Sequence, residues 1–174
     1  RSSGVDMERF AFSPQAISQN PVVLLSARFV EEKGIRFFVE ASRILKKRNK
    51  EIRFALVGKP EEDQPTAITL EELDQWVKDE DVEWWGWSES MEEAYPVANI
   101  VCLPTYYMEG VPKVLIEAAA CGCALIATDV PGCREVVQDG KNGLLIPPKD
   151  VDALANAIEK IFHDEKMLVS MGAN

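Results

Sequence analysis

The chain has 174 residues, of which 47% are hydrophobic and 28% charged, and its formal net charge is −10. This length suits a single domain with its own core. The acidic balance excludes nucleic acid or an anionic membrane as the main partner, because both bind basic surfaces. No apolar run is long enough to span a membrane.

The first half of the chain alternates between short apolar runs and amphipathic segments. Continuous apolar runs of this length are typical of strands buried on both faces of a parallel sheet. Thr69 and Glu72 form a capping box that predicts the start of a helix. The elements expected here are strands at about 21–26, 52–57 and 82–85, helices at 35–48 and 69–78, and a loop at 61–67.

The second half continues the alternation, so the sequence predicts a parallel sheet with helices on both faces. This is a Rossmann-like, doubly wound α/β fold, in which ligands bind beyond the carboxyl ends of the strands. The expected elements are strands at 100–103 and 123–127, helices at 90–98, 113–120 and near 132–134, loops at 104–112 and 139–143, and a last helix from Asp150.

The cysteines and the single histidine argue against a metal centre. Cys102, Cys121, Cys123 and Cys133 lie mostly in apolar surroundings, which favours buried free thiols in a reducing cytoplasm. His163 is expected to face solvent near a helix end. One histidine makes a histidine-based metal site or a Ser-His-Asp triad improbable.

The usual glycine-rich phosphate loops are absent. No two glycines are separated by a single residue, which excludes the dinucleotide fingerprint, and Gly58-Lys59 lacks the upstream glycine of a Walker A loop. A phosphate would therefore need another site, such as the free backbone N–H groups at a helix N-terminus.

The segment 106–113 is the first candidate, because it joins a buried strand to a helix. Gly110 allows a ligand to approach the backbone, and Pro112 suits the first helical turn. Glu109 and Glu117 could accept hydrogen bonds from sugar hydroxyls. The alternative is a capped helix with a solvated Glu117. Glutamate pairs with this spacing occur three times in the chain, so spacing leaves both interpretations open.

Arg28 and Lys33 form the second candidate, at a strand end and a helix start. A cation at a helix start opposes the helix dipole, so it should have an anionic partner. Two unit charges at ~4 Å gain ~4 kcal/mol at an effective dielectric of 20, enough to localise a diphosphate. The alternative is pairing with Glu31 and Glu32.

Three tryptophans, Trp84, Trp85 and Trp87, form the third candidate. Their clustering is compatible with stacking on a nucleobase. Alternation along a strand favours burial in the core or an interface instead. Gly86 is the better candidate for backbone contact with a base.

Several motifs, in order along residues 20–162, resemble the donor half of a GT-B glycosyltransferase. The resemblance is to the retaining family 4 (glycosyl transferases group 1), in its bacterial polysaccharide branch. It implies the C-terminal half of a GT-B fold that binds a nucleotide sugar, expected to be a UDP-sugar. In chain order, the motifs are Arg28-x₄-Lys33-Gly34, Glu109 to Ala118, Ala120 to Gly122, Ile126 to Gly132 and Gly140-x-Asn142-Gly143-Leu144-Leu145-x-Pro147.

The resemblance implies a role for each matching residue. Arg28 and Lys33 would bind the donor diphosphate and assist its departure, in place of a metal, and no D-x-D run is present. Glu109 would face the donor sugar, and Glu117 would accept from the ribose. Pro112, where the family often has glycine, removes one donor N–H. The implied backbone contacts to sugar, phosphate and base lie at Gly110, Val111, Pro112, Lys113 and Gly86.

The resemblance also implies a division of the chain and a missing partner. Residues 1–20 would be the linker from an absent N-terminal acceptor domain, residues 21–165 the nucleotide-sugar domain, and residues 166–174 a C-terminal tail. The fragment alone is expected to transfer no sugar. Family members often sit at the inner face of the cytoplasmic membrane, which would involve the absent half.

Two other functions remain open at this stage. One is a non-catalytic nucleotide-binding or interaction module of the doubly wound type, which the bare chain would equally well form. The other is a sugar-nucleotide epimerase of the same architecture, which is disfavoured because its site expects histidines that this sequence lacks.

Overall fold

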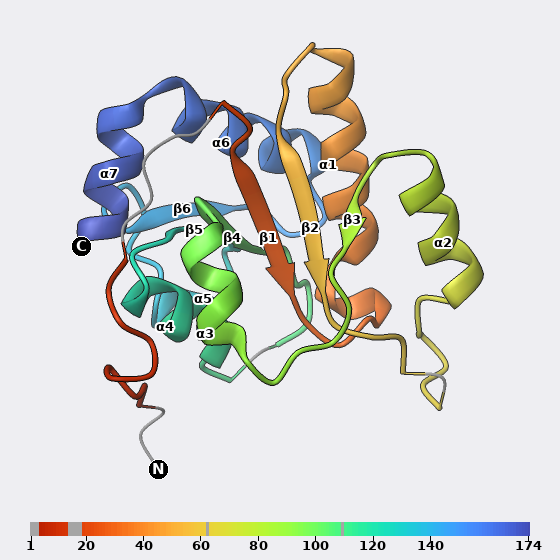
Figure 1. Cartoon of the computed structure of the whole chain (residues 1–174), viewed down its shortest axis with the longest axis horizontal. Helices are drawn as coiled ribbons and strands as arrows, with labels where there is room; N and C mark the ends of the chain where they lie inside the picture. The colour runs from red at the N-terminus through yellow and green to blue at the C-terminus, as the bar shows by residue number, and fades with distance from the viewer. Residues whose placement is uncertain (1–3, 14–18, 62, 109) are drawn as a thin grey trace.

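A parallel sheet of six strands forms the centre of the computed structural model, which describes residues 4–13, 19–61, 63–108 and 110–174 (Figure 1). The strand order β3-β2-β1-β4-β5-β6 and the parallel pairing of every neighbour confirm the predicted doubly wound sheet. The strands are β1 (Val22–Ser26), β2 (Arg53–Val57), β3 (Glu83–Trp84), β4 (Ile100–Leu103), β5 (Ala124–Thr128) and β6 (Gly143–Ile146).

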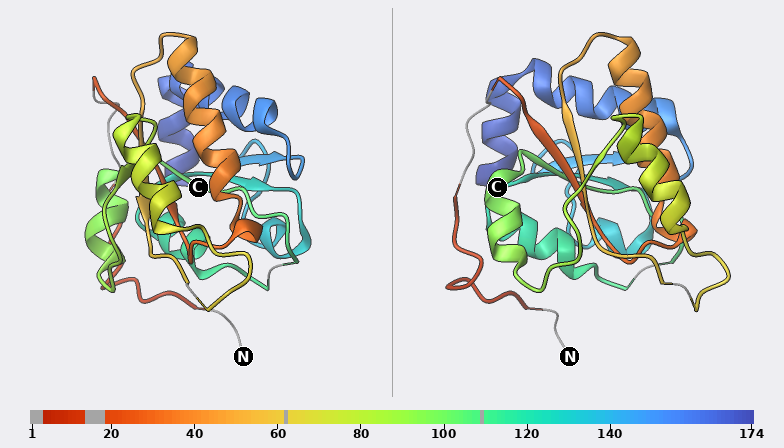
Figure 2. Two further views of the ribbon diagram at one scale, coloured as in Figure 1. Left: turned by 90° about the vertical axis from the view of Figure 1, so that its right-hand side faces the viewer. Right: turned by 45° about the vertical axis from the view of Figure 1, so that its right-hand side comes forward.

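Helices cover both faces of the sheet, as expected (Figures 1 and 2). Alternate residues of β1 point to opposite faces, so Val23 and Leu25 join one core cluster while Val22 and Leu24 join the other. The first cluster packs under α1, α2, α6 and α7, and the second under α3, α4 and α5. The helices are α1 (Ile35–Lys47), α2 (Leu70–Lys78), α3 (Met91–Ala94), α4 (Lys113–Ala120), α5 (Pro131–Arg134), α6 (Val151–His163) and α7 (Glu165–Ala173), with short 3-10 turns η1 (Glu31–Lys33) and η2 (Tyr95–Val97).

The C-terminal residues differ from the expected tail, because 166–174 form most of helix α7. The side chain of Asp164 accepts a hydrogen bond from the Met167 N–H at 3.0 Å and caps this helix. Leu168 and Met171 are buried against the rest of the core. Helix α7 is thus packed against the core through these two side chains.

Strand β6 was not among the expected strands. It has only four residues, and it directly follows the predicted turn at 139–143. It pairs in register with β5, from Gly143 opposite Leu125 to Ile146 opposite Thr128. A Cβ on Gly143 would lie 2.2 Å from the Leu125 carbonyl oxygen, so glycine is required there.

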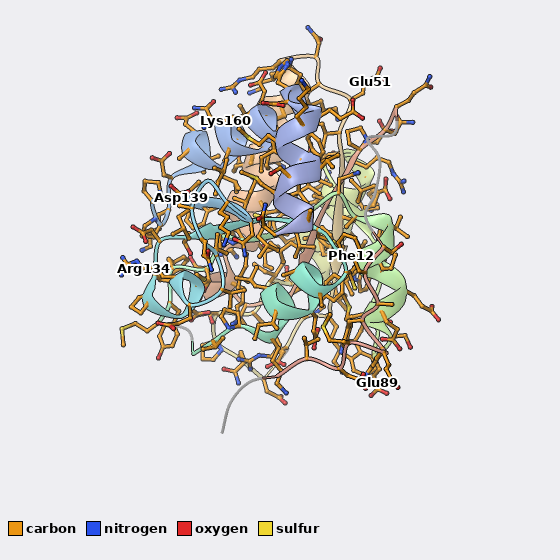
Figure 3. The ribbon with its side chains drawn as sticks, turned by 90° about the vertical axis from the view of Figure 1, so that its left-hand side faces the viewer. Phe12, Glu51, Glu89, Arg134, Asp139 and Lys160 are labelled. Atoms are coloured by element: carbon orange, nitrogen blue, oxygen red, sulfur yellow. The ribbon has the colours of Figure 1, made fainter. Side chains whose placement is uncertain are left out.

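The described part of the expected N-terminal linker packs on the domain. Phe10 is buried, with its ring centroid 6.0 Å from that of Tyr95. Arg9 donates to the Glu89 carbonyl and forms an ion pair of 2.8 Å with Glu92. Figure 3 shows this side of the molecule, with Phe12 and Glu89 labelled. Residues 4–13 are therefore anchored to the domain beside α3.

Candidate functional site

The candidate site lies where the strand order reverses, between β1 and β4. β1 is paired with β2 on one side and with β4 on the other. Because the strands are parallel, their carboxyl ends meet at one edge of the sheet, where the β1 and β2 arrowheads end in Figure 1. Doubly wound sheets bind ligands at such a reversal.

The basic pair is held at this edge by the segment that follows β1. Arg28 lies two residues beyond the end of β1, and Lys33 is the last residue of η1. Gly34 has φ of 77°, and a Cβ there would lie 2.1 Å from the Pro104 carbonyl oxygen. This close approach places the start of α1 directly beside the loop that follows β4.

Arg28 has a different acidic partner from the two considered in the sequence. Its guanidinium donates to a Glu61 carboxylate oxygen at 3.1 Å, while Glu31 pairs with Arg36. The Arg28 side chain is 62% exposed. Exposed pairs of this kind contribute only ~0–1 kcal/mol, so a stronger anion can displace Glu61.

The two cations share a cavity with the loop before α4. This cavity, called the central cavity below, has a volume of about 290 Å³. The structure thereby brings together two predicted features that are far apart in sequence. The central cavity is lined by Ser26, Ala27, Arg28, Lys33, Leu103, Gly110, Val111, Pro112, Lys113 and Val114.

The start of α4 supplies hydrogen-bond donors to this cavity. Pro112 is the N-cap, and its carbonyl accepts from the N–H groups of Leu115 and Ile116. The first amides of a helix, here those of Lys113 and Val114, have no acceptor within the helix. Donors and positive charge therefore face the same space as Arg28, which suits an anionic ligand.

Glu117 lies one turn further along α4 and does not line the central cavity. Its carboxylate accepts a hydrogen bond of 3.2 Å from the Tyr95 hydroxyl. Burial, and then the charge of Glu117, raise the pKa of Tyr95, so the phenol stays protonated and acts as the donor. No sequence pattern indicates this contact, which joins residues from η2 and α4. Glu109, expected to face the donor sugar, lies outside the described residues.

A second, smaller cavity continues from the central one. It has a volume of about 110 Å³ and shares Ser26, Ala27 and Arg28 with the central cavity. Its remaining wall comes from the ends of β2 and β3. These residues are Val57, Gly58, Lys59, Glu61, Trp87 and Ser88. It is called the side cavity below.

Two of the three clustered tryptophans donate hydrogen bonds within the domain, and the third is largely exposed. The Trp84 indole donates to the Gly58 carbonyl at 2.9 Å, and the half-buried Trp85 donates to Glu83. Trp87 is 56% exposed, with the Lys59 ammonium 5.2 Å from its ring centroid. Gly86 does not line the cavity. Trp87 is therefore the member of the cluster that a ligand in the side cavity would meet.

Neither a metal cluster nor a membrane helix is found within the described residues. No group of three or more histidine, cysteine, aspartate or glutamate side chains there could hold a metal ion. Within the same residues, every helix is too short or too polar to cross a membrane. The four cysteines are buried free thiols, as predicted. His163 is exposed, also as predicted.

Comparisons with known proteins agree on the family. The family model "Glycosyl transferases group 1" matches residues 20–164. The chain is 32% identical over 158 residues to N,N'-diacetylbacillosaminyl-diphospho-undecaprenol alpha-1,3-N-acetylgalactosaminyltransferase of Campylobacter jejuni. That match covers 91% of this chain and 40% of the relative. The chain thus spans about two fifths of the length of this curated relative.

Solved GT-B glycosyltransferases have the same fold. Sucrose-phosphate synthase from Thermosynechococcus elongatus matches with a TM-score of 0.81 and 30% identity, over 97% of this chain and 44% of that one. HepE of Anabaena, solved in complex with UDP, matches with a TM-score of 0.81 and 21% identity, over 98% of this chain and 49% of that one. The chain belongs to the Glycosyl transferases group 1 family and has the Rossmann-like fold of half a GT-B enzyme.

Proposed function

We propose that this chain, chiefly residues 21–165, is the C-terminal, donor-binding domain of a retaining glycosyltransferase. The full enzyme would transfer a sugar from a nucleoside diphosphate sugar to a polysaccharide, lipid-linked or other acceptor. An N-terminal domain elsewhere in a longer protein would hold that acceptor. The observation that carries the proposal is the central cavity, in which Arg28, Lys33 and the start of α4 face one another.

The donor diphosphate would occupy the central cavity. Arg28 and Lys33 supply two positive charges, and the first amides of α4 supply neutral donors. When the sugar leaves, negative charge grows on the diphosphate, and these groups stabilise it electrostatically. The basic pair would supply the charge that a metal ion supplies in other transferases, so we expect a metal-independent reaction.

The nucleoside would extend into the side cavity, because the two cavities share the residues from Ser26 to Arg28. The base would lie against Trp87, next to the predicted contact at Gly86. Glu117 would accept from the ribose while Tyr95 fixes its orientation. Glu109 would face the sugar, as the family resemblance implies. The UDP complex of HepE supports a uridine nucleotide as the first ligand to test.

The relatives and the buried cysteines support a cytoplasmic location for the reaction. The Campylobacter jejuni relative is named for transfer of N-acetylgalactosamine to a diphospho-undecaprenol-linked sugar. Buried free thiols are typical of a reducing compartment. We therefore place the donor site in the cytoplasm, where an acceptor at the inner face of the membrane would be within reach of the complete enzyme.

Isothermal titration calorimetry with UDP tests the proposal. Arg28→Ala should weaken binding at least about tenfold, because a charge-assisted hydrogen bond contributes ~1.5–3 kcal/mol. Lys33→Ala should act in the same direction. Lys47→Ala is the matched control, since Lys47 is exposed at the other end of α1. Equal affinities for Arg28→Ala and Lys47→Ala would refute the role of the basic pair.

A further inference from the structure

A third cavity lies against the same basic pair. It has a volume of about 390 Å³ and shares Arg28 and Lys33, but no other described residue, with the central cavity. It is called the outer cavity below. Its walls come from η1, the β2–α2 loop and the loop after β4. Its lining residues are Arg28, Val30, Glu32, Lys33, Gln64, Thr66, Tyr107 and Met108.

The β2–α2 loop forms a fixed wall of this cavity. Backbone hydrogen bonds of 2.8 Å join the Glu31 N–H to the Thr66 carbonyl and the Ile68 N–H to the Phe29 carbonyl. Val30 also forms an antiparallel bridge with Ala67. The loop therefore crosses the segment after β1 as a short ladder, which holds its side chains in place before any ligand arrives.

A carboxylate and a hydroxyl meet at the centre of this wall. The Thr66 hydroxyl lies 2.8 and 2.9 Å from the two Glu32 carboxylate oxygens and donates to them. The Glu32 pKa is lowered by its own backbone N–H, then by Thr66, and then by the charges of Arg28 and Lys33. Glu32 is thus ionised at neutral pH and retains acceptor sites beyond those that face the Thr66 hydroxyl.

The remaining lining adds an amide and exposed apolar groups. The Gln64 side chain, exposed in the same loop, carries both donors and an acceptor. Tyr107 and Met108 are 64% and 79% exposed on the opposite segment. A cavity lined by polar groups and an aromatic side chain suits a ligand with hydroxyl edges and an apolar face.

The charges restrict the chemistry of the ligand further. The Glu32 carboxylate opposes a second phosphate in the outer cavity. Arg28 and Lys33 oppose a metal ion there. A neutral ligand rich in hydroxyl groups is repelled neither by Glu32 nor by the basic pair. Its hydroxyls can donate to Glu32 and accept from Gln64. A sugar ring has this chemistry.

We propose that the outer cavity is a hexose subsite next to the donor diphosphate, with Glu32, Gln64 and Thr66 as its specificity-determining residues. This inference rests on the proposed function, because that function places the diphosphate on Arg28 and Lys33. The bound ring belongs either to the donor sugar or to the acceptor. Both sources present the same hydroxyl chemistry to the cavity, and the experiment below separates them.

Amide chemical shifts of the 174-residue chain provide the test. The probes are UDP, UDP-glucose, UDP-N-acetylglucosamine and UDP-N-acetylgalactosamine, and the methyl glycosides of the corresponding sugars and of mannose. If the cavity holds the donor sugar, a UDP-sugar shifts the amides of Gln64 and Thr66 beyond the effect of UDP. If it holds the acceptor sugar, a methyl glycoside shifts them in both free and UDP-saturated protein. No shift of these amides with any sugar overturns the subsite.

Variants connect the shifts to the side chains. Gln64→Ala and Thr66→Val should each weaken sugar binding about fivefold, the loss of roughly one neutral hydrogen bond, and leave UDP binding unchanged. Thr66→Ser should restore it, and Asp63→Ala, exposed in the same loop but not part of the wall, should have no effect. Unchanged sugar binding in Gln64→Ala and Thr66→Val overturns the subsite. If UDP does not shift the amide resonances of Lys33 or Gly110, the proposed function is refuted instead. The shifts caused by the methyl glycosides test the subsite whether or not UDP binds.

Discussion

Removal of the Glu61 carboxylate is predicted to tighten nucleotide binding. In the structure, Glu61 pairs with Arg28 at 3.1 Å, with side chains 28% and 62% exposed. A diphosphate that binds Arg28 must first displace this pair and then remain beside a negative charge. Exposed pairs contribute ~0.2–1 kcal/mol, so Glu61→Gln should strengthen UDP binding about 1.4- to 5-fold.

The control separates the pair from the overall charge of the molecule. Glu51→Gln changes the net charge equally but lies at an exposed site near the start of β2, labelled in Figure 3. Calorimetric titrations of wild type, Glu61→Gln and Glu51→Gln with UDP at low and high salt would be compared. The gain for Glu61→Gln should exceed that for Glu51→Gln and shrink as salt rises. Equal gains in both variants, or weaker binding in Glu61→Gln, would refute the reasoning.

Three further predictions concern stability. Leu168→Ala should lower the free energy of unfolding by about 2–4 kcal/mol in urea titrations, because Leu168 is buried on the core-facing side of α7. Gly143→Ala should cost more than about 2 kcal/mol, since the new Cβ would meet the Leu125 carbonyl oxygen at 2.2 Å and strand β6 would have to move. The pKa of Glu83 is lowered from its usual 4.5, first by its hydrogen bond to Arg53. The stability that this shift provides is present above pH 4.5 and is lost as the pH falls through the lower pKa of the folded state. Glu83→Gln should therefore make the melting temperature depend less on pH over that acidic range.

Each stability prediction has its own control. Val169→Ala, at an exposed position of α7, should stay within about 0.5 kcal/mol of wild type. Gly4→Ala should be neutral, because nothing lies within 4 Å of a Cβ there. Arg53→Met should remove the same part of the pH dependence as Glu83→Gln. A tail that contributed no packing would make Leu168→Ala indistinguishable from Val169→Ala.

The site regions that the sequence could predict are those that follow from strand polarity. Arg28 comes just after β1, residues 110–112 lie between β4 and α4, and Lys113 is the first residue of α4. Parallel strands carry such segments to the same edge, so their meeting in the central cavity could be expected without coordinates. The buried apolar runs were equally informative, because strands covered on both faces are hydrophobic throughout.

What the sequence could not reveal depends on contacts between distant segments. The partner of Arg28 is Glu61, 33 residues further along, and no periodicity links the two. The contact between Tyr95 and Glu117 depends on how η2 packs against α4. Strand β6 was missed because it begins at Gly143, a residue that the sequence assigned to the loop at 139–143. Helix α7 was missed because the capping signal of Asp164 directly follows the preceding helix.

The anchored N-terminal segment contacts a residue that positions Glu117 on α4. The ring of Phe10 packs on Tyr95, and the hydroxyl of Tyr95 orients Glu117. A displacement of residues 4–13 would open a void beside the tyrosine ring and free its hydroxyl to turn away from the carboxylate. If Glu117 accepts from a ribose, as proposed, the conformation of residues 4–13 and the orientation of its carboxylate would be coupled. Only two side-chain contacts, Phe10 on Tyr95 and Tyr95 to Glu117, would carry a movement of residues 4–13 to this carboxylate.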